Sequence, residues 1–424
     1  MTPIETQRAV EAVWRIEAAR LVAGLTRMTR DMSLAEELAQ DALVTALKDW
    51  PKNGIPNNPG AWLMQTAKRR AIDHFRRSKV LARNMPALTY DAELRQEDGA
   101  PDHDARLDDE VKDNLLSLIF TACHPILSPE ARSALTLRLV GGLTTAEIAR
   151  AFLVPEPTIQ QRIVRAKKTL ADAHVPFEVP GGHERARRIG SVLEVVYLIF
   201  NEGYAATAGD DWMRTELCDE ALRLGRILAR LAPAEPEVHG LVALMEIQAS
   251  RSEARVAADG TPILLLDQDR ARWNLILIRR GLAALAETER LGGSGGTYAL
   301  QAAIAACHAR ARKAGHTDWN RIAGLYDELA AVAPSPVVEL NRAVAHSMAY
   351  GPEAGLRLLE PLMELPLLKN YHLLPSVRGD FLRRRGRFDE ARVEFERAAA
   401  MTQNAREREL LLKQGELSHL QLQQ

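Results

Sequence analysis

Cysteine is scarce in this sequence, and long apolar runs are missing. The 424 residues include three cysteines, Cys123, Cys218 and Cys307, which are too widely spaced and odd in number for a disulfide framework. Free thiols are typical of a reducing compartment, so we expect a cytoplasmic protein. The N-terminus lacks the basic-then-apolar pattern of a signal peptide, and no run of about 18 apolar residues could span a bilayer. The sequence therefore predicts no membrane partner.

Patterns typical of metal sites and catalytic sites are also missing. Cys123-His124 and Cys307-His308 have no C-x-x-C or H-x-x-x-H partner nearby, which favours packing over metal binding. Three acidic residues could act as acid–base groups, but no nucleophile, metal cluster or phosphate-binding loop accompanies them. They are Glu202, Asp267 and Asp269. We therefore expect no metal, no cofactor, no catalytic residue and no enzymatic activity.

Net charge is close to zero, and aromatic residues are few. With 55 Lys and Arg against 56 Asp and Glu, a DNA-binding surface would have to be local. Aromatic residues make up 5% of the chain, whereas Ala, Leu and Arg dominate, which favours helices. The length exceeds that of one compact core. We predict an all-α protein with domains at 5–80, 112–175 and 184–424 and a linker at 81–111.

Residues 128–170 are typical of two short amphipathic helices joined by a turn. Thr144 fits the N-cap of the first helix, Glu147 completes a capping box, and Pro155 ends that helix. We expect Pro157 at the first position of the second helix. Its apolar seam is Ile159, Ile163, Ala166 and Leu170, and its opposite face shows Thr158, Gln161, Arg162, Arg165 and Lys168. The pattern predicts a helix-turn-helix that enters a DNA major groove, and a plain helical hairpin is the alternative.

A second basic element lies nearer the N-terminus. The Pro- and Gly-rich segment 49–60 predicts a loop, and a helix with a dense basic face follows from Ala61 to Arg77. Charge runs are often only solvated. The basic face could instead contact DNA phosphates while the loop holds unstacked bases. The helix before the loop has an acidic side, formed by Glu36, Glu37, Gln40 and Asp41.

Together these elements resemble an extracytoplasmic-function (ECF) RNA polymerase sigma factor of the sigma-70 family. The resemblance rests on AEELAQDALVTALKDW, a loop, PGAWLMQTAKRRAIDHFRR, a variable linker and a helix-turn-helix that ends in RIVRAKKTL. It implies that residues 10–77 form the helical bundle of sigma domain 2. Residues 112–170 would form sigma domain 4.

The resemblance also implies binding roles. Domain 2 would bind the β′ clamp of core RNA polymerase through Glu36, Glu37, Gln40, Asp41, Leu43 and Leu47. It would open and hold the promoter −10 element through Trp62, Lys68, Arg69, Arg70, Asp73, His74, Arg76 and Arg77. Domain 4, beside the β flap, would read the −35 element through Thr158, Gln161, Arg162, Arg165, Lys167 and Lys168. The family often has Asn at the position of Arg69, so polar recognition there is expected to differ.

The C-terminal half extends beyond ordinary members of that family, which stop near Ala173. The phrase FTACHP resembles a subgroup with a long tetratricopeptide-like extension. Small and aromatic residues near the end, including Gly379, Gly386 and Phe395, resemble one tetratricopeptide unit. We expect a helical solenoid with an unknown protein or ligand as its partner. A generic helical bundle is the alternative for residues 184–300.

Two functions fit these observations. The first is a sigma factor that binds core polymerase, recognises the −35 and −10 elements and promotes DNA opening, with the C-terminal domain regulating it. The alternative is a helix-turn-helix regulator with a protein- or ligand-sensing solenoid that does not replace sigma. This alternative leaves the acidic-faced helix and the basic helix unexplained. The acidic linker would be a solvated tether or would mimic nucleic acid in the RNA exit path.

Overall fold

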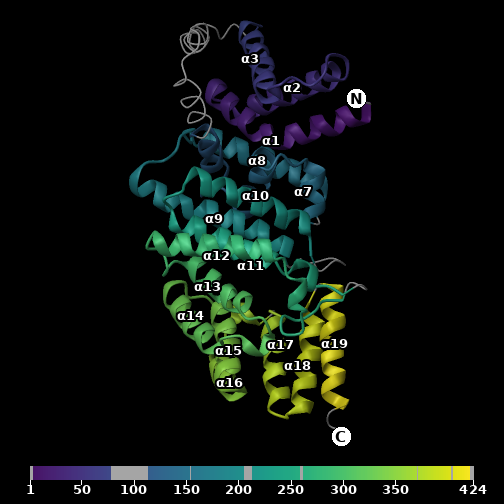
Figure 1. Ribbon diagram of the computed structural model, residues 1–424, viewed down its shortest axis with the longest axis vertical. Coiled ribbons are helices and arrows are strands. Elements are labelled where there is room, and N and C mark those ends of the chain that lie inside the picture. The colour runs from purple at the N-terminus through teal and green to yellow at the C-terminus, as the bar shows by residue number, and fades with distance from the viewer. Residues whose placement is uncertain are drawn as a thin grey trace. The chain divides into compact units, whose positions relative to one another are not determined.

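A computed structural model describes residues 3–77, 113–152, 154–204, 213–257, 261–369, 371–402 and 404–420. Over these residues the regular secondary structure is helical (Figure 1), and isolated β-bridge positions such as the pair Val256 and Pro262 occur between helices. The all-α prediction is therefore confirmed. The chain divides into two compact units, Met1–Leu198 and Ile199–Gln424. The predicted linker at 81–111 lies outside the described residues.

The first unit begins with three packed helices, α1 (Pro3–Thr29), α2 (Met32–Asn53) and α3 (Pro59–Arg77). The side chain of Asp31 caps α2 by accepting a hydrogen bond from the backbone N–H of Ser33 at 2.8 Å. Gly54 ends α2 at a φ of 85°, where residues with a Cβ are strained. Four alanines of α2 are completely buried, so the helices approach one another closely. They are Ala35, Ala39, Ala42 and Ala46.

The predicted helix-turn-helix is formed by α7 (Thr145–Ala151) and α8 (Glu156–Asp172), with α6 (Pro129–Leu139) before them. The capping box is present, because Glu147 N–H donates to Thr144 Oγ1 at 3.1 Å and Thr144 N–H donates to Glu147 Oε2 at 2.7 Å. Pro157 is the second residue of α8 and not the first, because the helix begins at Glu156. The whole apolar seam of α8 is buried, as its spacing predicts.

The long helix α9 (Gly182–Tyr204) follows the helix-turn-helix, and the boundary between the two units falls within it. Its first half caps the helical segment 113–122. Arg188 Nη2 donates to the backbone oxygen of Phe120 at 3.0 Å, and Ser191 Oγ donates to that of Cys123 at 2.6 Å. Carbonyls at a helix C-terminus lack partners within the helix and attract cations. The chain beyond Ala173 therefore begins as part of the first unit.

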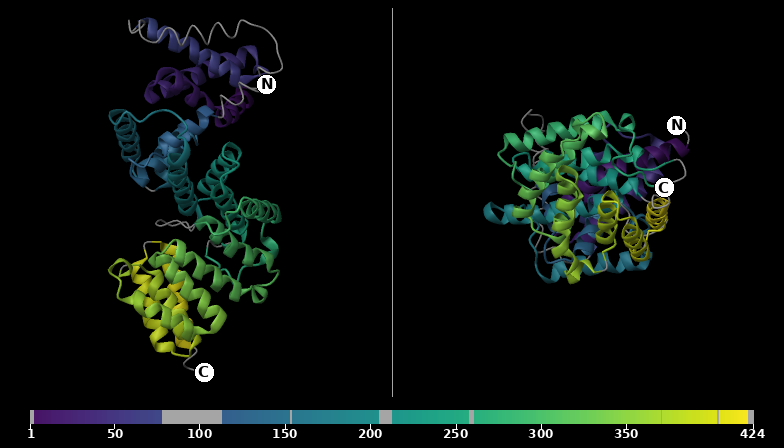
Figure 2. Two further views of the ribbon diagram at one scale, coloured as in Figure 1. Left: turned by 90° about the vertical axis from the view of Figure 1, so that its left-hand side faces the viewer. Right: turned by 90° about the horizontal axis from the view of Figure 1, so that it is seen from below.

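The second unit consists of successive packed helices (Figures 1 and 2). Their bounds are α10 (Thr215–Leu231), α11 (Pro236–Ala249), α12 (Leu275–Arg290), α13 (Thr297–Arg310), α14 (Trp319–Val332), α15 (Pro336–Tyr350), α16 (Pro352–Met363), α17 (Leu373–Arg384), α18 (Phe388–Met401) and α19 (Ala405–Leu420). Between α11 and α12 the described chain contains two short 3₁₀ helices, η1 (Ser252–Ala254) and η2 (Arg270–Arg272).

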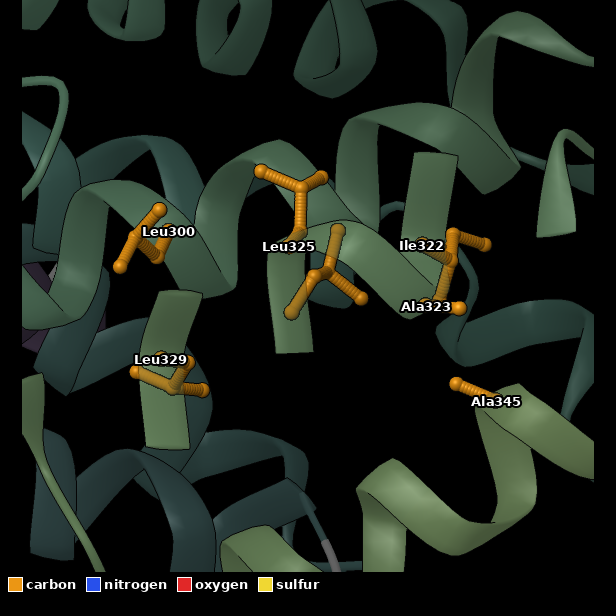
Figure 3. Packing of buried hydrophobic residues seen from close by; sticks show 7 residues of the cluster. Leu300, Ile322, Ala323, Leu325, Leu329 and Ala345 are labelled. Atoms are coloured by element: carbon orange, nitrogen blue, oxygen red, sulfur yellow. The ribbon is translucent and has the colours of Figure 1, made fainter. Parts of the chain in front are cut away.

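The described core of the second unit includes clusters that each join neighbouring helices. Figure 3 shows the cluster in which Leu300 of α13 meets Leu325 and Leu329 of α14 and Ala345 of α15. Another cluster joins α15, α16 and α17 around Phe381, and a third joins α17, α18 and α19. Each helix pair therefore buries its apolar side mainly against its neighbours in sequence, as in repeat proteins.

Close approach of helices in this series predicts a stability effect at Gly355. A Cβ there would lie 2.5 Å from Phe381 Cε2 and 2.6 Å from Ser347 Cβ. We expect Gly355→Ala to lower the free energy of unfolding by about 1–3 kcal/mol through overpacking, although Ala forms helix better than Gly. The measurement is urea unfolding of the full chain followed by circular dichroism.

The matched control is Gly324→Ala in α14, where a Cβ would meet no atom within 4 Å. The free energy of unfolding of this variant should be unchanged or higher by up to about 1 kcal/mol. Equal midpoints for the two variants would contradict the close packing at Gly355.

Candidate nucleic-acid interface

The polar face of α8 is accessible over most of its length. Thr158, Gln161, Arg165 and Lys168 are exposed, and Arg162 is half-buried. The buried seam on the opposite side holds the helix in the domain, so these side chains project from a fixed backbone. Such a face suits a major groove, where Gln and Arg read base edges and Lys contacts phosphate.

A hollow of about 360 Å³ lies beside this face. Four residues expected at the −35 element line it, namely Thr158, Gln161, Arg162 and Arg165. Ile126, Ser128 and Ala131, at the start of α6, line its other side. The sequence did not indicate these three, because they are distant in sequence from α8. Hydrogen bonds to its own backbone N–H and to Ser128, followed by the charge of Arg162, lower the pKa of the Glu130 carboxyl in the first turn of α6.

Lys167 differs from the other cations of α8, because its ammonium is ion-paired with Glu36 of α2. Arg138 of α6 donates to the same carboxylate, with Nε 2.5 Å from Glu36 Oε1. Burial alone would raise the pKa of Glu36, but Lys167 and Arg138 outweigh that effect and lower it. The structure thus brings together a residue expected to bind polymerase and one expected to bind DNA.

The basic face of α3 is also largely exposed. Arg69, Asp73, His74 and Arg76 are exposed, and Lys68 is half-buried. Trp62 is half-buried and packs edge-on against Trp50 with ring centroids 5.4 Å apart. Arg77 ends the helix, and its side chain lies outside the described part of the chain. Exposed cations beside a fixed aromatic ring are the groups that a single-stranded DNA segment requires.

Arg70 has a contact within the domain that the sequence did not indicate. Its guanidinium donates to Asp41 Oδ2 at 2.7 Å and to Thr45 Oγ1 at 2.8 Å, both on α2. This exposed ion pair connects the helix expected to bind polymerase to the helix expected to bind the −10 element. Exposed pairs of this kind contribute at most about 1 kcal/mol, so Arg70 and Asp41 can still exchange partners.

The remaining residues expected to contact polymerase lie on α2. Glu37, Gln40 and Leu47 are exposed, and Leu43 is half-buried. Val44, which the sequence reasoning missed, is 45% exposed beside Leu47 at 41%. Two exposed apolar side chains three residues apart on a helix form a small apolar surface. The sequence could have indicated Val44, because it lies one helical turn before Leu47 and therefore on the same side of α2.

Three residues considered for other chemistry, Cys123, Glu202 and Asp269, are buried or bonded within the chain. Burial raises the pKa of the Cys123 thiol to about 11, so it is not an activated nucleophile. Glu202 is ion-paired with Arg214, and Asp269 caps a short turn by accepting from Ala271 N–H at 2.9 Å. Among the described residues no group of His, Cys, Asp and Glu could hold a metal ion, and no helix could cross a membrane.

Comparisons with known proteins agree with this architecture. A model described as sigma-70 region 2 matches residues 15–80, and one described as sigma-70 region 4 matches residues 117–170. The chain contains the region 2 and region 4 domains of sigma-70 factors. A family of unknown function, DUF6596, matches residues 188–289. Region 2 therefore includes α2 and α3, and region 4 includes the helix-turn-helix.

Two relatives extend the comparison. The uncharacterized protein R00370 of Rhizobium meliloti is 45% identical over 398 residues, which cover 93% of this chain and 92% of that protein. The chain belongs to the same family as R00370. A probable ECF RNA polymerase sigma factor, SigI of Mycobacterium tuberculosis, is 28% identical over 179 residues, which cover 42% of this chain and 59% of SigI. These findings support a sigma factor and imply that region 2 and region 4 bind RNA polymerase and promoter DNA.

The capping box of α7 predicts a local stability effect within region 4. Thr144→Ala removes the side chain that accepts from Glu147 N–H, so α7 should open more easily, by about 1 kcal/mol. Amide hydrogen exchange of residues 144–151 would measure this change. As a control, Thr145→Ala removes only an exposed bond to Glu156 and should change protection by less than about 0.5 kcal/mol. Equal protection in both variants would contradict the role of the cap.

Proposed function

We propose that this chain is an ECF sigma factor that recognises the −35 and −10 promoter elements and promotes DNA opening. The observation that carries the proposal is the presence of region 2 and region 4 in one chain, each with an accessible polar or basic helix face. A regulator that only binds DNA needs region 4 alone. Such a regulator would not require the basic face of α3 or the exposed apolar pair Val44 and Leu47 on α2.

Region 4 would read the −35 element through α8. Thr158, Gln161, Arg162 and Arg165 would face base edges, and all four line the hollow beside the helix. Lys168 is exposed and would contact phosphate.

Region 2 would perform the other two steps. Glu37, Gln40, Asp41, Leu43 and Leu47 of α2 would contact the β′ clamp. On α3, Trp62 would stack on an unpaired base of the −10 element, and the exposed cations would hold the separated backbone.

The C-terminal unit would regulate this activity. Its consecutive helix pairs, with a core divided into neighbour-to-neighbour clusters, support a tetratricopeptide-like solenoid. Gly386, which the sequence assigned to a repeat, has a φ of 77° in the turn between α17 and α18, and Gly351 has a φ of 92° in the turn between α15 and α16. A solenoid presents an extended surface to a protein or ligand, and this unit would serve as the sensing part of the factor.

Run-off transcription with core polymerase from the source organism tests the proposed function. We expect specific initiation at promoters that share −35 and −10 elements and none with core polymerase alone. Failure to initiate at any promoter, with retained binding to DNA, would favour a helix-turn-helix regulator that does not replace sigma.

Two substitutions in α8 separate base reading from phosphate contact. Arg162→Ala should change the preferred −35 sequence, because a side chain that bonds to a base contributes about 1–3 kcal/mol to discrimination. Lys168→Ala should weaken binding to all sequences alike and reduce the salt dependence of log K by about 1. Binding to a −35 sequence library at several salt concentrations measures both effects. The reverse result would mean that α8 meets DNA with a different face.

Two truncations test the C-terminal unit. A chain that ends after Tyr204 keeps α9, whereas one that ends after Ala173 loses the bonds from Arg188 and Ser191 to segment 113–122. Both should change transcription in one direction or the other. The shorter chain should also unfold region 4 at a lower denaturant concentration, because the backbone carbonyls of Phe120 and Cys123 lose their hydrogen-bond donors. Transcription and polymerase affinity equal to those of the full chain would show that the extension is dispensable.

A further inference from the structure

Three charged side chains from separate helices meet inside the first unit. Glu36 lies on α2 of region 2, while Arg138 and Lys167 lie on α6 and α8 of region 4. One carboxylate oxygen of Glu36 accepts from Arg138 Nε and the other from Lys167 Nζ. The side chains of Glu36, Arg138 and Lys167 are only 15%, 19% and 13% exposed. Both carboxylate oxygens are therefore occupied, and solvent screens the charges weakly.

Other contacts support this arrangement. Arg138 Nη1 also donates to the backbone oxygen of Leu143 at 3.0 Å, which fixes the guanidinium just before the capping box of α7. Arg27 Nη1 of α1 donates to Asn114 Oδ1 at 3.2 Å. Helix α1 packs against α6. Region 2 and region 4 thus meet at Glu36, and the segment just before region 4 is joined to α1 through Asn114.

We propose that the Glu36–Arg138–Lys167 contact is an autoinhibitory latch that holds region 2 and region 4 together in the free protein. The inference rests on the proposed function, in which α2 binds polymerase and α8 binds DNA. While the latch is closed, the carboxylate of Glu36 is neutralised by this chain and not by a polymerase cation. The ammonium of Lys167 is likewise unable to contact a DNA phosphate.

The charges explain how the latch opens. A polymerase surface that binds α2 competes with Arg138 and Lys167 for Glu36, and DNA phosphates compete with Glu36 for Lys167. When only a fraction of the protein is open, apparent affinity falls by that fraction. Removing one cation should therefore raise the apparent affinity for polymerase by about 3- to 10-fold, since the second cation still holds Glu36 and the open fraction grows only in part.

The ion pair between Glu36 and Lys167 permits a direct test in the full chain. A water-soluble carbodiimide activates the Glu36 carboxylate, and the Lys167 amine displaces the urea leaving group to form an amide. Digestion and mass spectrometry should identify a Glu36–Lys167 cross-linked peptide in the free protein. Lys167→Arg keeps the cation but offers no amine, so the peptide should disappear. Added core polymerase should reduce its yield in the wild type.

Arg138 provides the functional variant, since it belongs to neither of the expected binding faces. Arg138→Gln should lower the cross-link yield and raise the apparent affinity for core polymerase by about 3- to 10-fold. Arg138→Lys retains the charge and should stay within about twofold of the wild type. Arg20→Gln, which removes an exposed cation of α1 paired with Glu17, is the matched surface control and should also stay within about twofold.

The outcomes distinguish the latch from the proposed function. Absence of the Glu36–Lys167 peptide from the free wild-type chain would overturn the latch, and so would equal polymerase affinity for Arg138→Gln and wild type. If no variant bound core polymerase, the proposed function would be wrong and the autoinhibitory role with it. The cross-link, which needs no polymerase, would still show whether the two helices meet in solution.

Discussion

Close packing of helices through alanine and glycine is the constraint on which this structure depends. Aromatic residues make up 5% of the chain, so large rings cannot fill wide gaps between helices. Fully buried alanines such as Ala42 and Ala67 allow short separations, and dispersion contacts then extend along each helix. Gly355 allows the same approach beside Phe381. The clusters that join α13 to α19 are local, because each one involves neighbouring helices.

Arginine provides many of the longer connections between these helices. Arg188 bonds to a helix C-terminal carbonyl, and Arg132 meets Ser191 and Glu194 of α9. Arg70 connects α3 to α2. A planar guanidinium with several donors can satisfy carbonyl and carboxylate oxygens together. A guanidinium also bonds well to DNA phosphates. The packing of the helices therefore decides which arginines bond within the chain and which remain exposed to a partner.

Local features of the functional domains were predictable from the sequence. The capping box at Thr144 and Glu147 and the apolar seam of α8 depend on residues within one or two turns of each other. The loop predicted at 49–60 is shorter in the structure, because α2 continues past Pro51 to Asn53 and α3 begins at Pro59. Pairing over long separations was not predictable. Glu36 and Lys167 are 131 residues apart, and both appear as ordinary surface charges on amphipathic helices. The pairing of Arg70 with Asp41 and the hollow beside α8 were missed for the same reason.

The sequence by itself determined the all-α class and the order of the basic helix and the helix-turn-helix, because helix period, capping and turn residues act locally. Tertiary structure alone decided which cations remain available. Lys167 and Arg138 form ion pairs with Glu36, whereas Lys168 is exposed. The first half of α9 belongs to the unit that contains region 4. The physical reason is that a charge is neutralised by whatever group lies within a few ångströms, and that neighbour depends on how the helices pack.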